Sequence, residues 1–138
     1  MRKTQIILIT LFFLFIISIF MFILYNIWES EGKTLVLEKA IEDAYWAAFA
    51  GLEYGKIQAL SGSTGSGSGL LSSNLRYSFA ISTIPGFPTR RRITASGFYY
   101  DNAGSLVAQK RLRVDIQGVN DGIPDNESTV AGSFYQIN

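Results

Sequence analysis

The residue types that most often carry out catalysis are scarce in this chain. Its 138 residues include no His and no Cys, which removes the usual general base near neutral pH and all thiolate chemistry. Ser72 and Ser73 have no Lys at a spacing that would hold it beside them, and the adjacent carboxylates Glu42 and Asp43 diverge by about 100° on a helix. We therefore identify no catalytic residues, and we expect neither enzymatic activity nor a bound cofactor.

One acidic segment has residues of the type that bind calcium. It runs from Asn120 to Glu127 and reads NDGIPDNE, which resembles the end of the calcium repeat of thrombospondin type III modules. Asp121 and Asp125 match carboxylate positions of that repeat, but its two earlier carboxylate positions hold other residue types here. Calcium takes six to eight oxygen ligands. We therefore interpret the segment as a polar turn and keep Asp121, Asp125 and Glu127 as a weak calcium candidate.

Six basic residues lie on two stretches that are predicted to form neighbouring strands. They are Arg90, Arg91, Arg92, Lys110, Arg111 and Arg113. A basic patch of this kind could bind phosphate groups with a salt-sensitive affinity. However, no aromatic side chains are clearly interleaved for stacking on bases, and residues 29–138 contain ten basic and eleven acidic residues. We favour a solvated turn and sheet face, and we do not expect nucleic acid as a partner.

The elements that would position any such site begin with an apolar stretch. Thr4–Trp28 contains 25 residues and no charge, so as a helix it would extend roughly 37 Å, against roughly 30 Å for the hydrocarbon core of a bilayer. Arg2 and Lys3 precede it and acidic residues follow it, which predicts a cytoplasmic N-terminus. Residues 1–28 are therefore predicted to form a membrane helix.

A cleaved signal peptide is the alternative interpretation of this stretch, and it fits poorly. The apolar region is longer than the ~7–15 residues usual in such peptides, and no small-x-small cleavage site follows Trp28. We expect the helix to be retained as a single membrane span, with the rest of the chain outside the cytoplasm.

A second helical stretch is predicted from about Thr34 to Leu60, within the segment 29–60. When successive residues are placed 100° apart, small and apolar side chains gather on one face and most charges lie on the other. Glycines four residues apart on the apolar face would let another backbone approach closely. The residues that we expect to pack on a sheet are Ile41, Ala44, Ala48, Gly51, Leu52 and Gly55.

Four apolar residues fall among the charges of this helix, at angles where a monomer would expose them to water. Single apolar residues on a surface are common. A Trp with three apolar neighbours on a charged face instead indicates a second packing partner. These candidates for contact between subunits are Leu35, Trp46, Phe49 and Ile57.

Residues 61–74 are dominated by Gly and Ser, with the run SGSTGSGSG at 61–69. This composition is typical of a flexible connector. A phosphate-binding loop is not favoured, because no Lys followed by Ser or Thr comes after the glycines. We predict a loop.

The hydrophobic period changes to two after this loop, and short turn sequences separate the alternating stretches. Consecutive strands with short turns imply antiparallel pairing. The fold class predicted is therefore α+β, with a long N-terminal helix, half membrane-spanning and half amphipathic, packed on a three- to four-stranded sheet within residues 75–138. The predicted strands are Leu75–Ile84, Arg91–Tyr100 and Leu106–Gln117, with a weaker fourth near Val130–Ile137.

This layout resembles the type IV pilins. The segment Ala44–Leu60, AYWAAFAGLEYGKIQAL, is similar to a segment of minor pilins of the PilX and MshP kind, and the later ITASGFYYDNAGSLVAQKRLRVDI resembles the strand pair that ends many such domains. The chain departs from the family pattern near its N-terminus, where it has no Gly-Phe junction and no acidic residue between Met1 and Trp28. The motif positions that match are Ala44, Tyr45, Ala47, Ala48, Ala50, Gly51 and Glu53.

The resemblance implies a structural subunit, a minor pilin or pseudopilin, of a type IV pilus-like filament. Its partners would be copies of itself, other pilins, the membrane and the inner-membrane pilus assembly machinery, and it would move from the membrane to an extracellular filament. The alternative is a non-polymerising, single-pass membrane-anchored adaptor or binding protein. The expected assembly positions on the apolar helix are Ile6, Leu11, Phe15, Phe20, Ile23 and Trp28.

Overall fold

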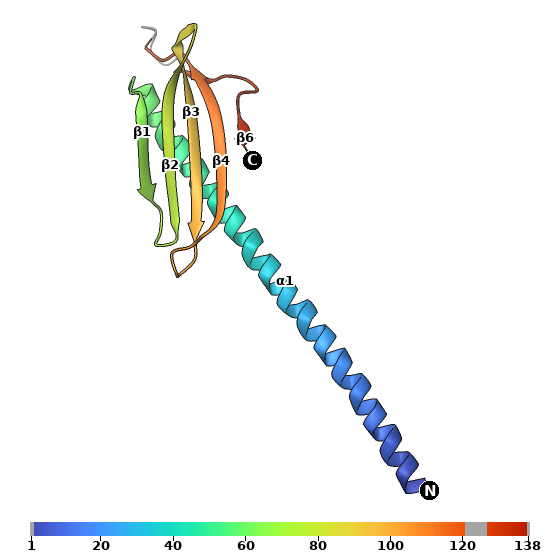
Figure 1. Ribbon diagram of the computed structural model, residues 1–138. Coiled ribbons are helices and arrows are strands. Elements are labelled where there is room, and N and C mark those ends of the chain that lie inside the picture. The colour runs from blue at the N-terminus through green and yellow to red at the C-terminus, as the bar shows by residue number, and fades with distance from the viewer. Residues whose placement is uncertain (1, 121–126, 138) are drawn as a thin grey trace. The chain divides into compact units, whose positions relative to one another are not determined.

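A computed structural model describes residues 2–120 and 127–137. Within these residues, helix α1 spans Arg2–Leu60 and six strands follow it (Figure 1). The expected α+β class is confirmed, because part of one long N-terminal helix packs on an antiparallel sheet. The strands are β1 (Gly65–Leu70), β2 (Leu75–Ile84), β3 (Phe87–Tyr100), β4 (Leu106–Gln117), β5 (Ser128–Thr129) and β6 (Tyr135–Ile137).

The chain divides into two compact units, of which one ends at Val36 and the other begins at Leu37. In the first unit, the side chains of α1 from Gln5 to Val36 are all exposed. Among the described residues, α1 is the one helix that is long and apolar enough to cross a membrane. The chain thus contains a helix that can serve as a single membrane span, as its apolar stretch predicts.

The second unit contains a sheet with the strand order β1–β2–β3–β4–β5, in which β6 also pairs with β4. All of these pairs are antiparallel. Gly86 and Gly104 adopt left-handed backbone conformations in the β2–β3 and β3–β4 turns, with φ of 82° and 83°, which a residue with a Cβ adopts at a cost. The carboxylate of Asp101 accepts hydrogen bonds from the N–H groups of Ala103 and Ser105 and so closes the second turn.

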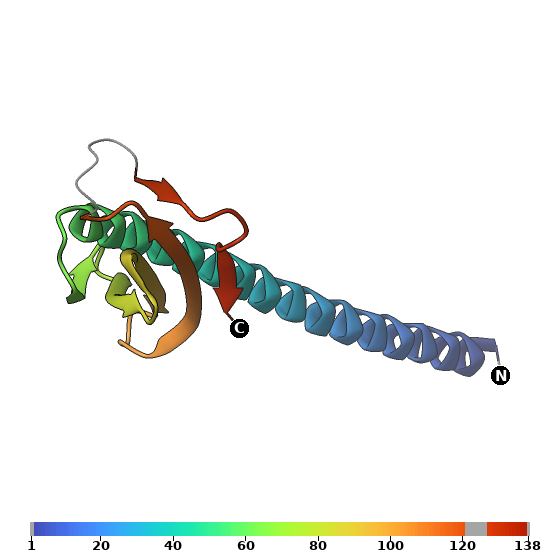
Figure 2. The same cartoon turned by 90° about the horizontal axis from the view of Figure 1, so that it is seen from above.

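The core lies between the last turns of α1 and one face of the sheet (Figure 2). Most of the buried residues on its helix side are small, so the helix backbone comes close to the strands. Gly97 of β3 marks the closest approach, because a Cβ at this position would overlap the carbonyl oxygen of Ala44 and the backbone nitrogen of Ala48. The largest fully buried side chains are Leu52, Ile93, Leu112, Val114 and Val119.

Strand β1 corrects the prediction that residues 61–74 form a loop. It pairs with β2 along its whole length, from Gly65 opposite Ile81 to Leu70 opposite Arg76. The glycines that suggested flexibility provide space, because the Phe79 ring lies against the position that a Cβ on Gly67 would take. Gly69 leaves the same space for the Tyr77 ring.

Strand β3 also begins earlier than the sequence predicts, at Phe87 rather than near Arg91. The turn between β2 and β3 needs only Pro85 and Gly86, because Ile84 already pairs with Phe87. The pattern of apolar residues could not show this pairing, since the first residues of β3 do not face the core.

The last part of the chain forms two short strands, β5 and β6, rather than one strand near Val130–Ile137. Between them the hydroxyl group of Ser133 accepts a hydrogen bond from the N–H of Asp115 at 3.1 Å and donates one to its carbonyl oxygen at 3.0 Å. A side chain thus satisfies the backbone of β4 where a paired strand would otherwise continue. Over residues 2–120 and 127–137 the sheet has six strands instead of three or four.

Candidate functional site

The expected assembly positions all lie in the first unit, and each of their side chains is exposed. Apolar side chains without cover in their own chain need lipid or another protein around them. Among the residues whose exposure is described, the apolar part of α1 therefore forms the most extended candidate interaction surface. Its expected positions are Ile6, Leu11, Phe15, Phe20, Ile23 and Trp28.

The positions expected to pack on the sheet mostly lie in the core. Ala44, Ala48 and Leu52 have no exposed surface, and the glycines at 51 and 55 are buried against β2 and β3. Ile41 is the exception and corrects the expectation, because it is 37% exposed. By helical angle, Ile41 lies on the same face as Ala44. In this turn of the helix, however, only the side that carries Ala40 and Ala44 is buried, where it contacts Ala108 of β4.

An aromatic cluster lies on the helix of the second unit. Trp46 is 55% exposed, and its ring stands edge-on to the rings of Tyr45 at 5.7 Å and Phe49 at 6.0 Å between ring centres. Ile57 also has an exposed side chain on this unit, and Leu35 is exposed in the first unit. Edge-on ring pairs hold an aromatic side chain in place, so Trp46 presents a preformed apolar surface to solvent.

Phe49 requires a correction within this group. It was expected beside Trp46 as a contact for another subunit, but its ring is half-buried and packs against the hydrophobic core. The angle around the helix places only the Cβ of a residue, and a long aromatic ring can reach sideways from there to the sheet. Trp46, Ile57 and Leu35 therefore remain as exposed candidates, with Phe49 as support for Trp46.

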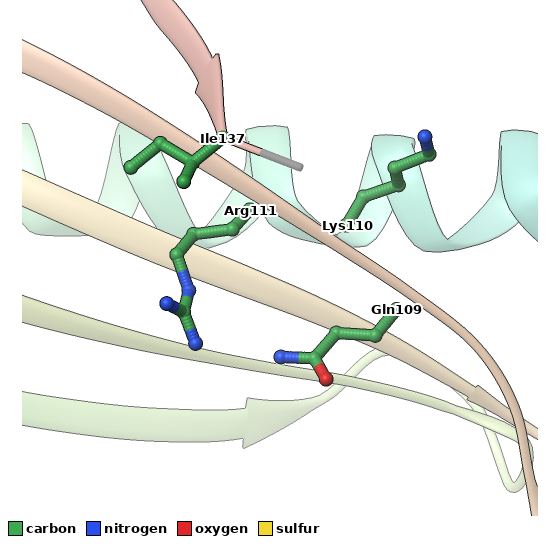
Figure 3. A pocket seen from close by; sticks show the side chains of 4 residues that line it. All are labelled: Gln109, Lys110, Arg111 and Ile137. Carbon is green, nitrogen blue, oxygen red and sulfur yellow. The ribbon is translucent and has the colours of Figure 1, made fainter.

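The basic cluster of the sequence is divided between the two faces of the sheet. Arg111 and Gln109 point to one side of β4 and Lys110 to the other (Figure 3). Arg91 is buried on the helix side, where its guanidinium donates a hydrogen bond to the carbonyl oxygen of Pro88 at 2.6 Å. The six residues therefore do not form one continuous basic patch.

Arg92 and Asp115 form a bidentate ion pair on the face of the sheet away from α1. Arg92 Nε donates to Asp115 Oδ1 and Arg92 Nη2 donates to Asp115 Oδ2, both at 2.9 Å. These hydrogen bonds lower the pKa of Asp115 below its ordinary value and raise that of Arg92. Burial of the Asp115 carboxylate opposes the shift and is the weaker effect. The charge of Arg92 is thus neutralised within the sheet.

The weak calcium candidate lies mostly outside the described residues, since Asp121 and Asp125 belong to 121–126. Glu127 is described and is exposed. Within residues 2–120 and 127–137, His, Cys, Asp and Glu form no group of three that could hold a metal ion.

The face of the sheet away from α1 carries a shallow depression that the sequence analysis missed. Two adjoining grooves of about 490 and 540 Å³ cross β1, β2 and β3 and share Ser68 and Ser78. We call this surface the outer trough. The feature of the sequence that could have revealed the outer trough is the alternation of Ser, Thr and Ala with core residues. Its floor is formed by Ser66, Ser68, Ser78, Ala80, Thr94 and Ser96.

The described residues therefore present three candidate interaction surfaces, namely the apolar part of α1, the cluster around Trp46 and the outer trough. Comparison of the chain with protein-family models, with curated proteins and with solved structures finds no match.

Proposed function

We propose that this protein is a structural subunit of a type IV pilus-like filament, a minor pilin or pseudopilin, and that it polymerises through α1. Before assembly α1 anchors the chain in the membrane, and after assembly the subunit is part of an extracellular filament. Its partners are copies of itself, other pilins and the membrane-embedded assembly machinery.

The exposed Trp46 carries the proposal. A membrane accounts for the apolar side chains up to Trp28, but Trp46 lies well beyond that stretch, among charged residues. An anchor alone gives no reason for a large aromatic side chain held in place by Tyr45 and Phe49 on a solvent-facing part of the helix. A neighbouring subunit that packs on this part of α1 would cover it and remove its apolar surface from water.

A second function is supported by a different observation. The outer trough is a polar, hollowed surface on the face of the sheet away from α1. A non-polymerising, single-pass adaptor could present this surface to a ligand outside the cytoplasm. The two functions differ in what α1 must do, because an anchor needs only to be apolar, whereas a filament core needs side chains of defined shape.

The deciding experiment replaces Thr4–Trp28 with an unrelated apolar 25-residue segment. Membrane insertion should persist under both functions and serves as the control for expression. If the protein is a filament subunit, the native chain appears in filaments sheared from cells and the replaced chain does not. Equal amounts of both chains in the sheared fraction, or recovery of the native chain from washed membranes only, would show that α1 is merely an anchor.

A further inference from the structure

The outer trough owes its shape to an unusual choice of residues for an exposed sheet face. Strand register places Ser66, Ala80 and Thr94 in one row across β1–β3, and Ser68, Ser78 and Ser96 in the next. Exposed strands are usually stabilised by β-branched and aromatic side chains, and Thr94 alone belongs to those types. Stability of the sheet therefore does not explain this floor, whereas the close approach of a flat, polar partner does.

Five of the six floor residues, all except Ala80, carry a hydroxyl group, and the register spaces them regularly. Neighbouring strands lie about 4.8 Å apart, and residues two apart on one face are separated by about 7 Å along the strand. Each hydroxyl can both donate and accept a hydrogen bond. Such an array matches a partner that carries many hydroxyl groups of its own in a repeated arrangement.

Arginines border the trough on two sides. Arg111 follows Ser96 in the second row, and its Nε donates a hydrogen bond to Ser96 Oγ at 3.3 Å, so the side chain extends from β4 toward β3 (Figure 3). At one end, Arg76 lies over the ring of Tyr100 at 5.1 Å from the ring centre. Neither arginine forms an ion pair with a carboxylate among the described residues, whereas the nearby Asp115 is neutralised by Arg92.

An aromatic ring completes this end of the trough. Phe98 faces the same side of the sheet as Arg76, directly opposite it in the register, and its ring centre lies 6.5 Å from that of Tyr100. Arg76 covers the Tyr100 ring, so Phe98 provides one apolar platform beside two rows of hydroxyl groups. An apolar platform, hydroxyl groups and guanidinium groups are together the groups that recognise the ring faces, hydroxyls and carboxylates of an acidic sugar chain.

We infer that the outer trough binds an extended polysaccharide that carries carboxylate groups. Arg76 and Arg111 bind the carboxylates, the Ser and Thr hydroxyls bind sugar hydroxyls, and Phe98 packs against a sugar ring. A nucleic acid fits this surface less well, because single strands are bound by several stacking rings along a strongly basic groove. Here one ring is free, and residues 29–138 have one more acidic than basic residue.

The test measures binding of polygalacturonate to the full chain in neutral detergent micelles. Arg111→Gln and Arg76→Gln should each weaken binding about tenfold, the effect expected for loss of one charge-assisted hydrogen-bonded contact. Lys110→Gln is the matched control, because it removes the same charge from the same strand on the opposite face (Figure 3). It should leave the affinity unchanged, and uncharged dextran should not bind.

Two further variants test whether a loss of affinity comes from misfolding or from the change in net charge. Arg111→Lys preserves the charge but not the planar guanidinium, so it should recover part of the affinity that Arg111→Gln loses. Ser78→Ala removes one hydroxyl without any change in charge and should weaken binding several-fold. Equal weakening by Lys110→Gln and Arg111→Gln would overturn the inference, as would the absence of polygalacturonate binding. Tighter binding of a single-stranded oligonucleotide at equal charge, with the same dependence on Arg111, would show a nucleic-acid surface instead.

Discussion

Individual residues of the sheet hold its outer face in a defined arrangement, and the pair of Arg92 and Asp115 joins two of its strands. Its two hydrogen bonds of 2.9 Å join a planar guanidinium to both oxygens of a carboxylate, which is the favoured geometry for such pairs. The pair links β3 to β4 beside Ser133, which bonds the backbone of Asp115. Asp115 thus contacts β3 through its carboxylate and the segment between β5 and β6 through its backbone.

Stability should depend on pH through Asp115. Its pKa in the folded protein is lowered by Arg92, so its contribution is present above the ordinary Asp pKa of about 3.9 and is lost as the pH falls through the lower folded value. Asp115→Asn should therefore reduce the free energy of unfolding by about 1 kcal/mol at neutral pH. The difference from the native chain should shrink below about pH 4, as measured by thermal unfolding at several pH values.

Arg92→Gln provides the check on this prediction. Because the hydrogen bonds from Arg92 are the largest cause of the shift, this variant should lose the same pH-dependent stability as Asp115→Asn. A pH profile like that of the native chain would assign the stabilisation of the carboxylate to other groups.

A single glycine sets how closely the helix lies on the sheet. A Cβ at Gly97 would overlap backbone atoms of Ala44 and Ala48, which cannot rotate away. Gly97→Ala should therefore destabilise the second unit by about 3 kcal/mol, the upper end of the usual range for overpacking. The control is Gly32→Ala, where nothing lies within 4 Å of the added Cβ. That change should leave the melting temperature unchanged or raise it, since Ala favours helix more than Gly does. Equal melting temperatures for both variants would contradict the close approach at Gly97.

At the scale of elements, β1 shows how a strand can be built from Gly and Ser. Its glycines at 67 and 69 lie against core rings of β2, and its serines at 66 and 68 face outward. The core aromatic rings of β2 extend beneath the glycines, so β1 adds a strand without adding side chains to the core. The strand is stabilised by its backbone pairing with β2 and by its cover over Phe79 and Tyr77.

Valine substitutions distinguish this strand from a flexible connector. Gly69→Val should cost about 1–3 kcal/mol, because its side chain would take the place of the Tyr77 ring. Ser68→Val, one residue away on the outward face, should be neutral or slightly stabilising, because Val favours exposed strands. A free linker would tolerate both changes equally, and chemical unfolding curves of the two variants decide between these outcomes.

At the scale of the whole molecule, the exposed apolar surface of the described residues is concentrated on α1. The part of α1 in the first unit has a long series of exposed apolar side chains, and the part in the second unit exposes Trp46 and Ile57. If the chain polymerises as proposed, both surfaces become covered in one assembly step. Insertion in a membrane alone covers the first surface.

Trp46→Ala should therefore lower the amount of filament without unfolding the second unit. Burial of an aromatic side chain contributes on the order of 1.5–3 kcal/mol, so the loss at each subunit contact should reduce incorporation into sheared filaments at least tenfold. Phe134→Ala is the control, because Phe134 is an aromatic residue of similar exposure outside α1. A drop in melting temperature with Trp46→Ala comparable to that of a core substitution would mean that Trp46 stabilises the fold rather than the filament.

Much of the architecture follows from local patterns in the sequence. The apolar stretch determined the membrane-span candidate, because length and lack of charge suffice for that inference. The periods of 3.6 and 2 determined the helix and the bounds of β2 and β4, which agree with the structure at both ends. Ala44, Ala48 and Leu52 were placed on the sheet side of the helix for the same reason. These properties depend on residues close together in the chain.

The remaining features were decided by contacts between distant residues. Whether a Gly/Ser run is a linker or a strand depends on the rings of Phe79 and Tyr77 that lie beneath it. The composition of the run itself does not show that these rings of β2 will lie there. Ile41 is exposed and Phe49 half-buried because the sheet has a limited extent and rings reach sideways, neither of which is contained in a helical angle. The outer trough exists only once the register brings the serines of β1, β2 and β3 into two rows. Register and strand order are set by packing across the sheet, so the tertiary structure alone determined this surface.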